Sequence, residues 1–392
     1  MIPNTSLARF PWITLTLLIS FASVNAVLYT PALPDIATFL QISHAQGEST
    51  VAWFLIGYAL GQLFYGPLAE RFGRKQALYM GMGLQILASL GCALTYYNAS
   101  FEWLIACRLL VAIGAGVGLK MTFTFVNEWY EPKVASQKIA YLMLAFAMTP
   151  GLAVGLGGFL NTYLGWPSCF LAGAVYGVAL CVLVSQLPIP PSVINKKALQ
   201  LGHLRKAYQQ QFTNVSLLTG GLLMGAAGCF VYVFAALAPF IAIELMQMSS
   251  SEYGLANIIP SLGMIGGCLC SGQWVKKYNL KYLIKVGTAV SSLGVVIMAG
   301  TMLIGLSPWF SLFLPMMIIY FGLSFVMANA STLAMSLVVD KSHGSAVMNF
   351  INVGVATLGV LALGLCSIQA MLLPIVYLMI CLVMGITILA RL

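Results

Sequence analysis

Twelve long apolar segments constrain this chain more than any other feature of its sequence. A helix needs about 20 mostly apolar residues to cross the hydrocarbon core of a bilayer. The segments that meet this length are approximately 12–33, 51–69, 77–97, 103–125, 137–160, 167–187, 215–243, 253–274, 282–304, 309–337, 344–366 and 371–390. With 60% apolar and 7% charged residues, the chain cannot cover a water-soluble surface. The sequence therefore predicts an all-α integral membrane protein with twelve transmembrane helices.

The longest hydrophilic break divides the chain almost evenly. It covers residues 188–211 and holds four Lys and Arg residues. We interpret it as a cytoplasmic linker between two six-helix halves, residues 1–187 and 212–392.

Basic residues alternate between the predicted loops. Sixteen of the eighteen Lys and Arg residues fall on one side of the predicted helices. The loops on the other side have no Lys or Arg and hold Asp35, Glu48, Glu102, Glu244 and Glu252. Since short basic loops stay in the cytoplasm, both termini are predicted to be cytoplasmic, with the chain in a bacterial-type inner (plasma) membrane. No dense basic tract accompanies the net charge of +9, so lipid, and not nucleic acid, is the expected surrounding partner.

The loop after the second predicted helix carries a specific motif. It reads GPLAERFGRKQAL over residues 66–78 and resembles the hallmark loop of the major facilitator superfamily, with Glu70 where Asp is usual. Glycines allow a tight turn, and the acid and cations offer partners across a cytoplasmic gate; an ordinary basic loop is the alternative. The candidate gate residues, with Glu128 added as an acid near the same side, are Gly66, Glu70, Arg71, Gly73, Arg74, Lys75 and Glu128.

A degraded copy of this loop, residues 272–281, follows the eighth predicted helix. Such internal repetition is typical of transporters that hold a substrate near the midplane between two halves. Further stretches, YTPALP at 29–34, FLIGYALGQ at 54–62 and FAALAPF at 234–240, resemble the bicyclomycin and chloramphenicol resistance branch. The resemblance implies the major facilitator fold and an exporter of drugs or metabolites of the kind usually driven by protons.

Departures from the pattern of that branch weaken the expectation of proton antiport. Val27 stands where an acid is usual in the first helix, and Val154 replaces a proline of the fifth-helix antiporter motif. Every carboxylate is expected in a loop or at a helix end. Coupling to protons would then use Asp35, Glu70, Glu128 or a histidine.

Two cations, Arg108 and Lys120, lie well inside the fourth predicted span. A charge at a helix centre costs about 2.5 to 3.5 kcal/mol on translocon scales, so each needs a physical reason. Either the long side chains reach toward the interface, or both cations face a cavity and favour an anionic substrate. Twelve residues separate them, about 18 Å of rise and about 120° of rotation, so they do not form one clamp.

Amide and aromatic side chains complete the candidate substrate-binding set, which suits a cavity for mixed polar and apolar molecules. Together with Arg108 and Lys120, the set contains Asn25, Tyr29, Tyr58, Gln62, Tyr232, Phe234, Asn329 and Asn349. Packing between helices is the alternative role for each polar member.

Export of small organic molecules is the first functional hypothesis. The second is transport of an anionic metabolite or a siderophore-like carboxylate metal chelator, because of the two cations. No cofactor or metal site is expected, since the cysteines lack metal-binding spacing. An enzyme is disfavoured because the P-loop, HExxH and GxSxG motifs are missing.

Overall fold

The structure, a computed structural model, describes residues 10–130, 132–188, 209, 211–335, 338, 341–366 and 369–391. Every regular element in these ranges is helical. Twelve of the helices within them are long and apolar enough to cross a membrane, which confirms the predicted number of spans. The predicted linker, 188–211, lies outside the described residues except for three positions.

The first six spans contain nine helical elements in the described part of the chain. They are α1 (Phe10–Val27), η1 (Thr30–Ala32), α2 (Leu33–Leu40), α3 (His44–Phe72), α4 (Arg74–Asn98), α5 (Phe101–Ala115), α6 (Val117–Trp129), α7 (Pro132–Leu164) and α8 (Pro167–Ser185). The first span extends to Leu40, beyond its predicted end near residue 33, because the chain continues through a short turn of helix into α2. The fourth span is interrupted at Gly116, so Arg108 and Lys120 sit on separate helices.

Three of the last six spans are also divided into more than one element in the described part of the chain. They contain α10 (Val215–Pro239), η2 (Phe240–Leu245), α11 (Ser250–Ala256), α12 (Ile258–Trp274), α13 (Leu280–Leu303), η3 (Trp309–Phe313), α14 (Leu314–Met335), α15 (Lys341–Leu363) and α16 (Leu372–Arg391). The π-helical segment η2 begins after Pro239, where a proline removes a backbone donor from the regular helical ladder.

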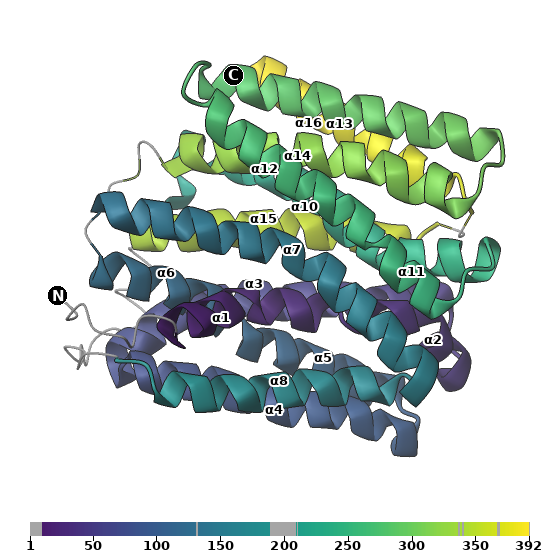
Figure 1. The fold of residues 1–392 in the computed structure, drawn as a ribbon, viewed down its shortest axis with the longest axis horizontal. Coiled ribbons are helices and arrows are strands. Elements are labelled where there is room, and N and C mark those ends of the chain that lie inside the picture. Colours follow the sequence, from purple (N-terminus) through teal and green to yellow (C-terminus); the bar gives the residue numbers. More distant parts are fainter. Residues whose placement is uncertain are drawn as a thin grey trace.

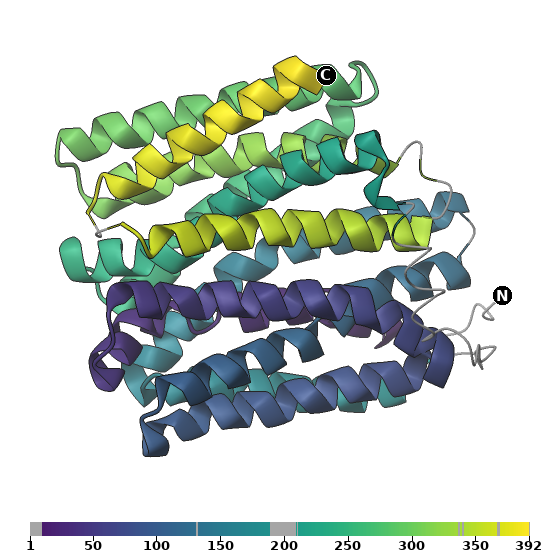
Figure 2. The same cartoon turned by 180° about the vertical axis from the view of Figure 1, so that it is seen from behind.

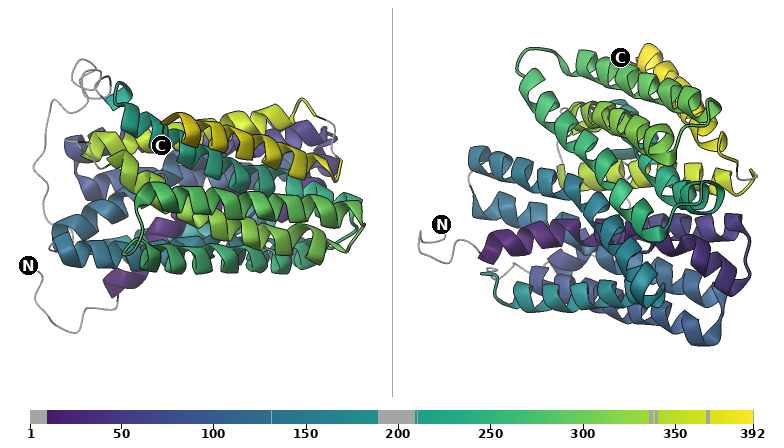
Figure 3. Two further views of the ribbon diagram at one scale, coloured as in Figure 1. Left: turned by 90° about the horizontal axis from the view of Figure 1, so that it is seen from above. Right: turned by 45° about the vertical axis from the view of Figure 1, so that its right-hand side comes forward.

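The helices form two bundles that lie side by side. Figure 1 shows α1 to α8 in the lower bundle and α10 to α16 in the upper one. Three helix pairs make the most extensive contacts between the bundles, namely α3 with α15, α7 with α11, and α7 with α12. The view from behind shows α15 running alongside α3 (Figure 2). Seen from above, the long helices of the molecule run in roughly the same direction (Figure 3).

Burial separates central helices from those at the periphery. Most apolar residues of α10 are buried, whereas most of those of α13 and α16 are partly or fully exposed, including Leu293, Leu382 and Leu389. Because lipid tails are as apolar as leucine, such exposure is stable only within a bilayer. The molecule is a multi-pass integral membrane protein.

The two ends of the bundles differ in charge, and we name them for it. The basic end carries Arg71, Arg74 and Lys75, between α3 and α4. The acidic end carries Asp35, Glu102, Glu244 and Glu252, at the opposite ends of the helices.

Candidate functional site

Arg108 is buried in the first bundle, with 1% of its surface exposed. Its Nη1 donates a hydrogen bond to the Asn25 carbonyl at 2.9 Å, and Nη2 donates to the Ala26 carbonyl at 3.5 Å. Both carbonyls belong to the last turn of α1, which ends at Val27 and so has no helical partners for them. The guanidinium therefore caps the negative end of a helix dipole.

Aromatic rings enclose the same guanidinium. Arg108 Cζ lies 3.9 Å from the centre of the Tyr29 ring and 4.5 Å from that of Phe54. The Tyr29 hydroxyl is hydrogen-bonded to the Thr50 hydroxyl at 2.7 Å, which holds the ring in place. A planar cation between ring faces gains electrostatic attraction in a dry site. Arg108 is thus held inside the bundle and does not extend toward the interface, while its Nε lacks a hydrogen-bond partner among the described residues.

Asn25 belongs to a polar network within the first bundle. Its Oδ1 accepts from Gln85 Nε2 at 2.7 Å, and its Nδ2 donates to the Phe21 carbonyl. Gln85 is fully buried and also donates to Ser89 and to the Gly173 carbonyl. These bonds join α1, α4 and α8. Asn25 therefore packs helices together, which was the alternative to a role in substrate binding. Sequence reasoning missed Gln85, although a glutamine in the middle of an apolar span was a visible signal.

Lys120 occupies a different site, nearer the basic end. It is half-buried on α6, and its Nζ lies directly against Gly66 of α3. A larger residue than glycine at position 66 would collide with the ammonium. The structure therefore separates the two cations, as the sequence spacing predicted.

Three of the other candidates lie along the interface between the bundles. Tyr58 on α3 is close enough to Tyr232 on α10 for an electrostatic interaction. One turn further along α3, Gln62 is 2% exposed, and its Nε2 has no hydrogen-bond partner in the described part of the chain. Buried amides are normally bonded, and the nearby Tyr58 hydroxyl lies close enough to the Gln62 side chain to interact with it.

The remaining candidates differ in their surroundings. Phe234 packs edge-on against Phe313 and Tyr320. Asn329 donates to Ser271 Oγ at 3.0 Å and so joins α14 to α12 inside the second bundle. Asn349 is half-buried on α15.

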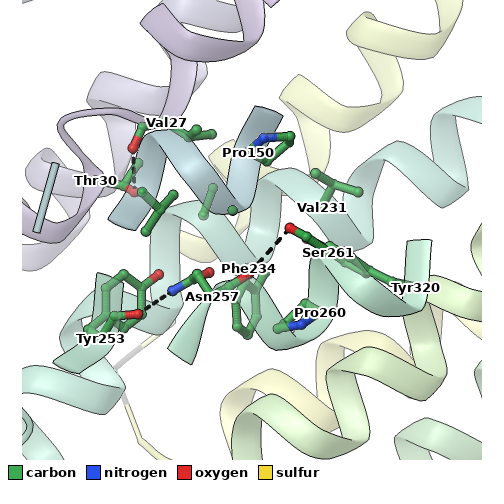
Figure 4. Close-up of a pocket in the computed structure, with 13 residues that line it drawn as sticks. Val27, Thr30, Pro150, Val231, Phe234, Tyr253, Asn257, Pro260, Ser261 and Tyr320 are labelled. Atoms are coloured by element: carbon green, nitrogen blue, oxygen red, sulfur yellow. Dashed lines mark hydrogen bonds between the residues drawn. The ribbon is translucent and has the colours of Figure 1, made fainter. Parts of the chain in front are cut away.

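A small pocket lies where the two bundles meet (Figure 4). Val27, Thr30 and Pro150 line it from the first bundle, and Phe234 and Asn257 from the second. Its volume of about 20 Å³ corresponds to about one water molecule. Phe234 is the one predicted binding residue among those that line it.

Polar contacts join the bundles at the acidic end. His44 Nε2 lies 2.8 Å from Glu244 Oε2. Asn161 donates to Ser250 Oγ at 3.2 Å, and Ser250 Oγ donates to the Pro31 carbonyl at 3.3 Å. Together with the small volume of the pocket, these contacts show that the acidic end is closed.

The predicted gate residues lie together at the basic end. Arg74 forms an ion pair with Glu128, and Lys75 Nζ donates to the Ser185 carbonyl at 3.4 Å. Burial raises the pKa of the Glu128 carboxyl, and Arg74 offsets part of that rise. Gly73 adopts a φ of 95° between α3 and α4, a conformation that favours glycine. The contacts named here lie within the first bundle.

Two further gate candidates complete the loop. Arg71 lies over the ring of Phe72, with Cζ 5.5 Å from the ring centre. Glu70 is exposed to solvent.

Glu48 corrects the expectation that every carboxylate lies in a loop or at a helix end. The helix α3 begins at His44, seven residues before its predicted start, so Glu48 lies within it. Only 2% of its surface is exposed, and its Oε2 has no hydrogen-bond partner among the residues described. Hydropathy underestimated the helix because its first turns are polar.

Comparison with known proteins identifies the family. The profile of the Major Facilitator Superfamily matches residues 15–362. Multidrug resistance protein D of Escherichia coli is 27% identical over 68% of this chain and 66% of its own length. Chloramphenicol resistance protein CraA of Acinetobacter baumannii is 25% identical over 69% of this chain and 65% of its own. The chain thus aligns with slightly less than two thirds of these two relatives.

A solved structure shows the same fold. The partially occluded, inward-open xylose transporter XylE of E. coli superposes with a TM-score of 0.77 over 99% of this chain and 98% of its own, at 14% identity. The twelve spans, the two bundles and the match of the profile to most of the sequence agree with one another. The chain belongs to the major facilitator superfamily of membrane transporters and resembles its bicyclomycin and chloramphenicol resistance branch.

Proposed function

We propose that this protein exports small, uncharged or weakly polar organic molecules by alternating access. The observation that carries the proposal is the character of the interface between the bundles. Tyr58, Gln62, Tyr232 and Phe234 offer aromatic faces and a buried amide there, and none of these four is charged. Similarity to relatives named for multidrug and chloramphenicol resistance supports the same substrate class.

The contacts of Arg108 disfavour the anionic alternative. Its guanidinium already binds two carbonyls and two aromatic faces, and among the described residues Nε is its one nitrogen without a hydrogen-bond partner. Lys120 remains half-buried near Gly66, so an anion would meet one flexible cation in place of a bidentate clamp.

The orientation follows from charge. We place the basic end and both termini in the cytoplasm, because short basic loops stay on that side. Residues 1–187 and 212–392 would then move as two rigid halves joined by the linker 188–211. In this arrangement the structure has its extracytoplasmic end closed by His44, Glu244, Asn161 and Ser250.

Reconstituted liposomes with an imposed pH gradient test the function. We expect radiolabelled chloramphenicol to accumulate against its gradient, and citrate, a polyanionic probe, to remain unmoved. Gln62→Leu should lower chloramphenicol flux about fivefold to tenfold, because a lost hydrogen bond is worth about 1 kcal/mol. Thr387→Ala, on the exposed face of α16, is the matched control and should transport normally. Citrate flux without chloramphenicol flux would establish the anionic alternative.

A further inference from the structure

The side chain of Glu48 is buried, and the residues around it on α3 lie against the second bundle. His44 and Glu48 are four residues apart and share one face of α3. The His44 ring lies 4.9 Å from the ring of Phe240 in η2, centre to centre. A Cβ at Gly364, after α15, would lie 3.7 Å from the Cβ of Ala45.

These neighbours fix the direction in which Glu48 points. Around the helix axis it lies about 40° from His44 and about 60° from Ala45, that is, between them. Both of those residues touch the second bundle. Glu48 therefore faces the second bundle, and the closed extracytoplasmic end accounts for its 2% exposure.

No counter-charge compensates Glu48 in the described part of the protein. His44, on the same helix, is engaged by Glu244 of η2. Asp35 of α2 accepts from Asn161 of α7. Tyr29 is bonded to Thr50. Gly364, just after α15, and Phe240 of η2 also lie near this face of α3, and neither can ionise.

An ionised carboxylate without a partner is unstable in such a site, whereas a protonated one is tolerated. When the bundles separate at this end, water reaches the carboxyl and the ionised form becomes stable. The geometry points to Glu48 as a proton-binding site whose occupation is linked to closure of the extracytoplasmic end. On closure, the Glu48 carboxylate takes one proton from extracytoplasmic water. This inference rests on the proposed alternating access and orientation, but not on any particular substrate.

Because one proton is linked to closure, the size of the pH effect on closure can be stated. The ratio of closed to open molecules should fall by up to tenfold for each unit that external pH rises. Val27 stands where an acid is usual in the first helix, whereas Glu48 lies on α3, in the next span along the chain.

A reporter thiol measures the opening without any transport. Ala235 is 7% exposed and lines the pocket between the bundles. In right-side-out vesicles of Ala235→Cys, a membrane-impermeant maleimide should react faster as external pH rises from 6 to 8. The same reporter combined with Glu48→Gln gives the pH dependence of the thiol chemistry alone. Vesicles without the reporter correct for native cysteines.

We expect the maleimide reaction rate to rise more steeply with pH in the protein that keeps Glu48 than in Glu48→Gln. The difference should be up to tenfold for each pH unit. Glu102→Gln, an exposed acid at the same end, is the matched control and should keep the slope of the parent. Equal slopes with and without Glu48 would overturn the inference.

Infrared difference spectroscopy provides a second measurement should Glu48→Gln fail to fold. The closed protein should show a neutral carboxyl band that shifts in Glu48→Asp, and absence of any such band would reject the site. Because neither measurement uses a substrate, a normal pH slope with no chloramphenicol flux would reject only the proposed substrate. Flux with no pH slope would reject only Glu48.

Discussion

At the scale of single residues, Arg108 shows how a membrane protein stabilises a buried charge. The end of α1 supplies two free carbonyls, and Tyr29 and Phe54 supply ring faces. The cation therefore replaces its lost hydration with fixed dipoles.

Removing that side chain should destabilise the fold. Arg108→Ala leaves buried carbonyls unbonded, which costs about 1–3 kcal/mol for each unsatisfied group. We expect a lower Tm in detergent by several degrees, and only partial recovery with Arg108→Lys, whose single ammonium cannot reproduce the planar contacts. Arg391→Ala, at the exposed end of α16, should leave Tm unchanged. An unaltered Tm with lost substrate binding would instead place Arg108 in the binding site.

At the scale of helices, interruptions and turns in the helical spans determine where the functional groups lie. Gly116 divides the fourth span, and Pro239 precedes the π-helical segment that carries Phe240 and Glu244. Gly73 makes the turn between α3 and α4 with φ of 95°.

The turn at Gly73 can be tested against a glycine in regular helix. Gly73→Ala forces a side chain into a backbone conformation, φ 95° and ψ 153°, that is essentially restricted to glycine, at a cost of about 1–3 kcal/mol, so we expect reduced thermal stability. Gly83→Ala, in α4 with open space around it, should be neutral or stabilising by up to about 1 kcal/mol. Equal effects of the two substitutions on Tm would show that the turn is not strained by alanine.

At the scale of the whole molecule, the two bundles meet through close backbone contacts. A Cβ at Gly158 of α7 would collide with the Ser250 carbonyl oxygen of the second bundle. Gly157, its neighbour, instead packs against Leu28 within the first bundle.

A methyl group at position 158 should therefore open the extracytoplasmic end. We expect Gly158→Ala to raise the maleimide reactivity of the Ala235→Cys reporter severalfold at fixed pH. Gly385→Ala, which meets nothing within 4 Å, is the control and should not change the rate. Unchanged reactivity in Gly158→Ala would mean that this contact does not limit opening.

The sequence predicted some features of this structure well and others poorly. Hydropathy predicted the twelve spans because each helix must be apolar along its own length, whatever its neighbours. The gate loop was recognisable because its glycines and charges are consecutive. Helix ends were less predictable, since the capped polar start of α3 at Ser43 carries little hydropathy signal.

The sequence by itself determined the number of helices, the charge difference between the two ends and the family resemblance, because these depend on local composition. The tertiary structure decided the partners of the polar groups. Arg108 meets carbonyls 82 and 83 positions away. His44 and Ala45, on either side of Glu48 around the axis of α3, lie against residues from the other half of the chain. Burial and hydrogen bonding are properties of packed helices, and packing brings together residues whose spacing in the sequence carries no trace of the contact.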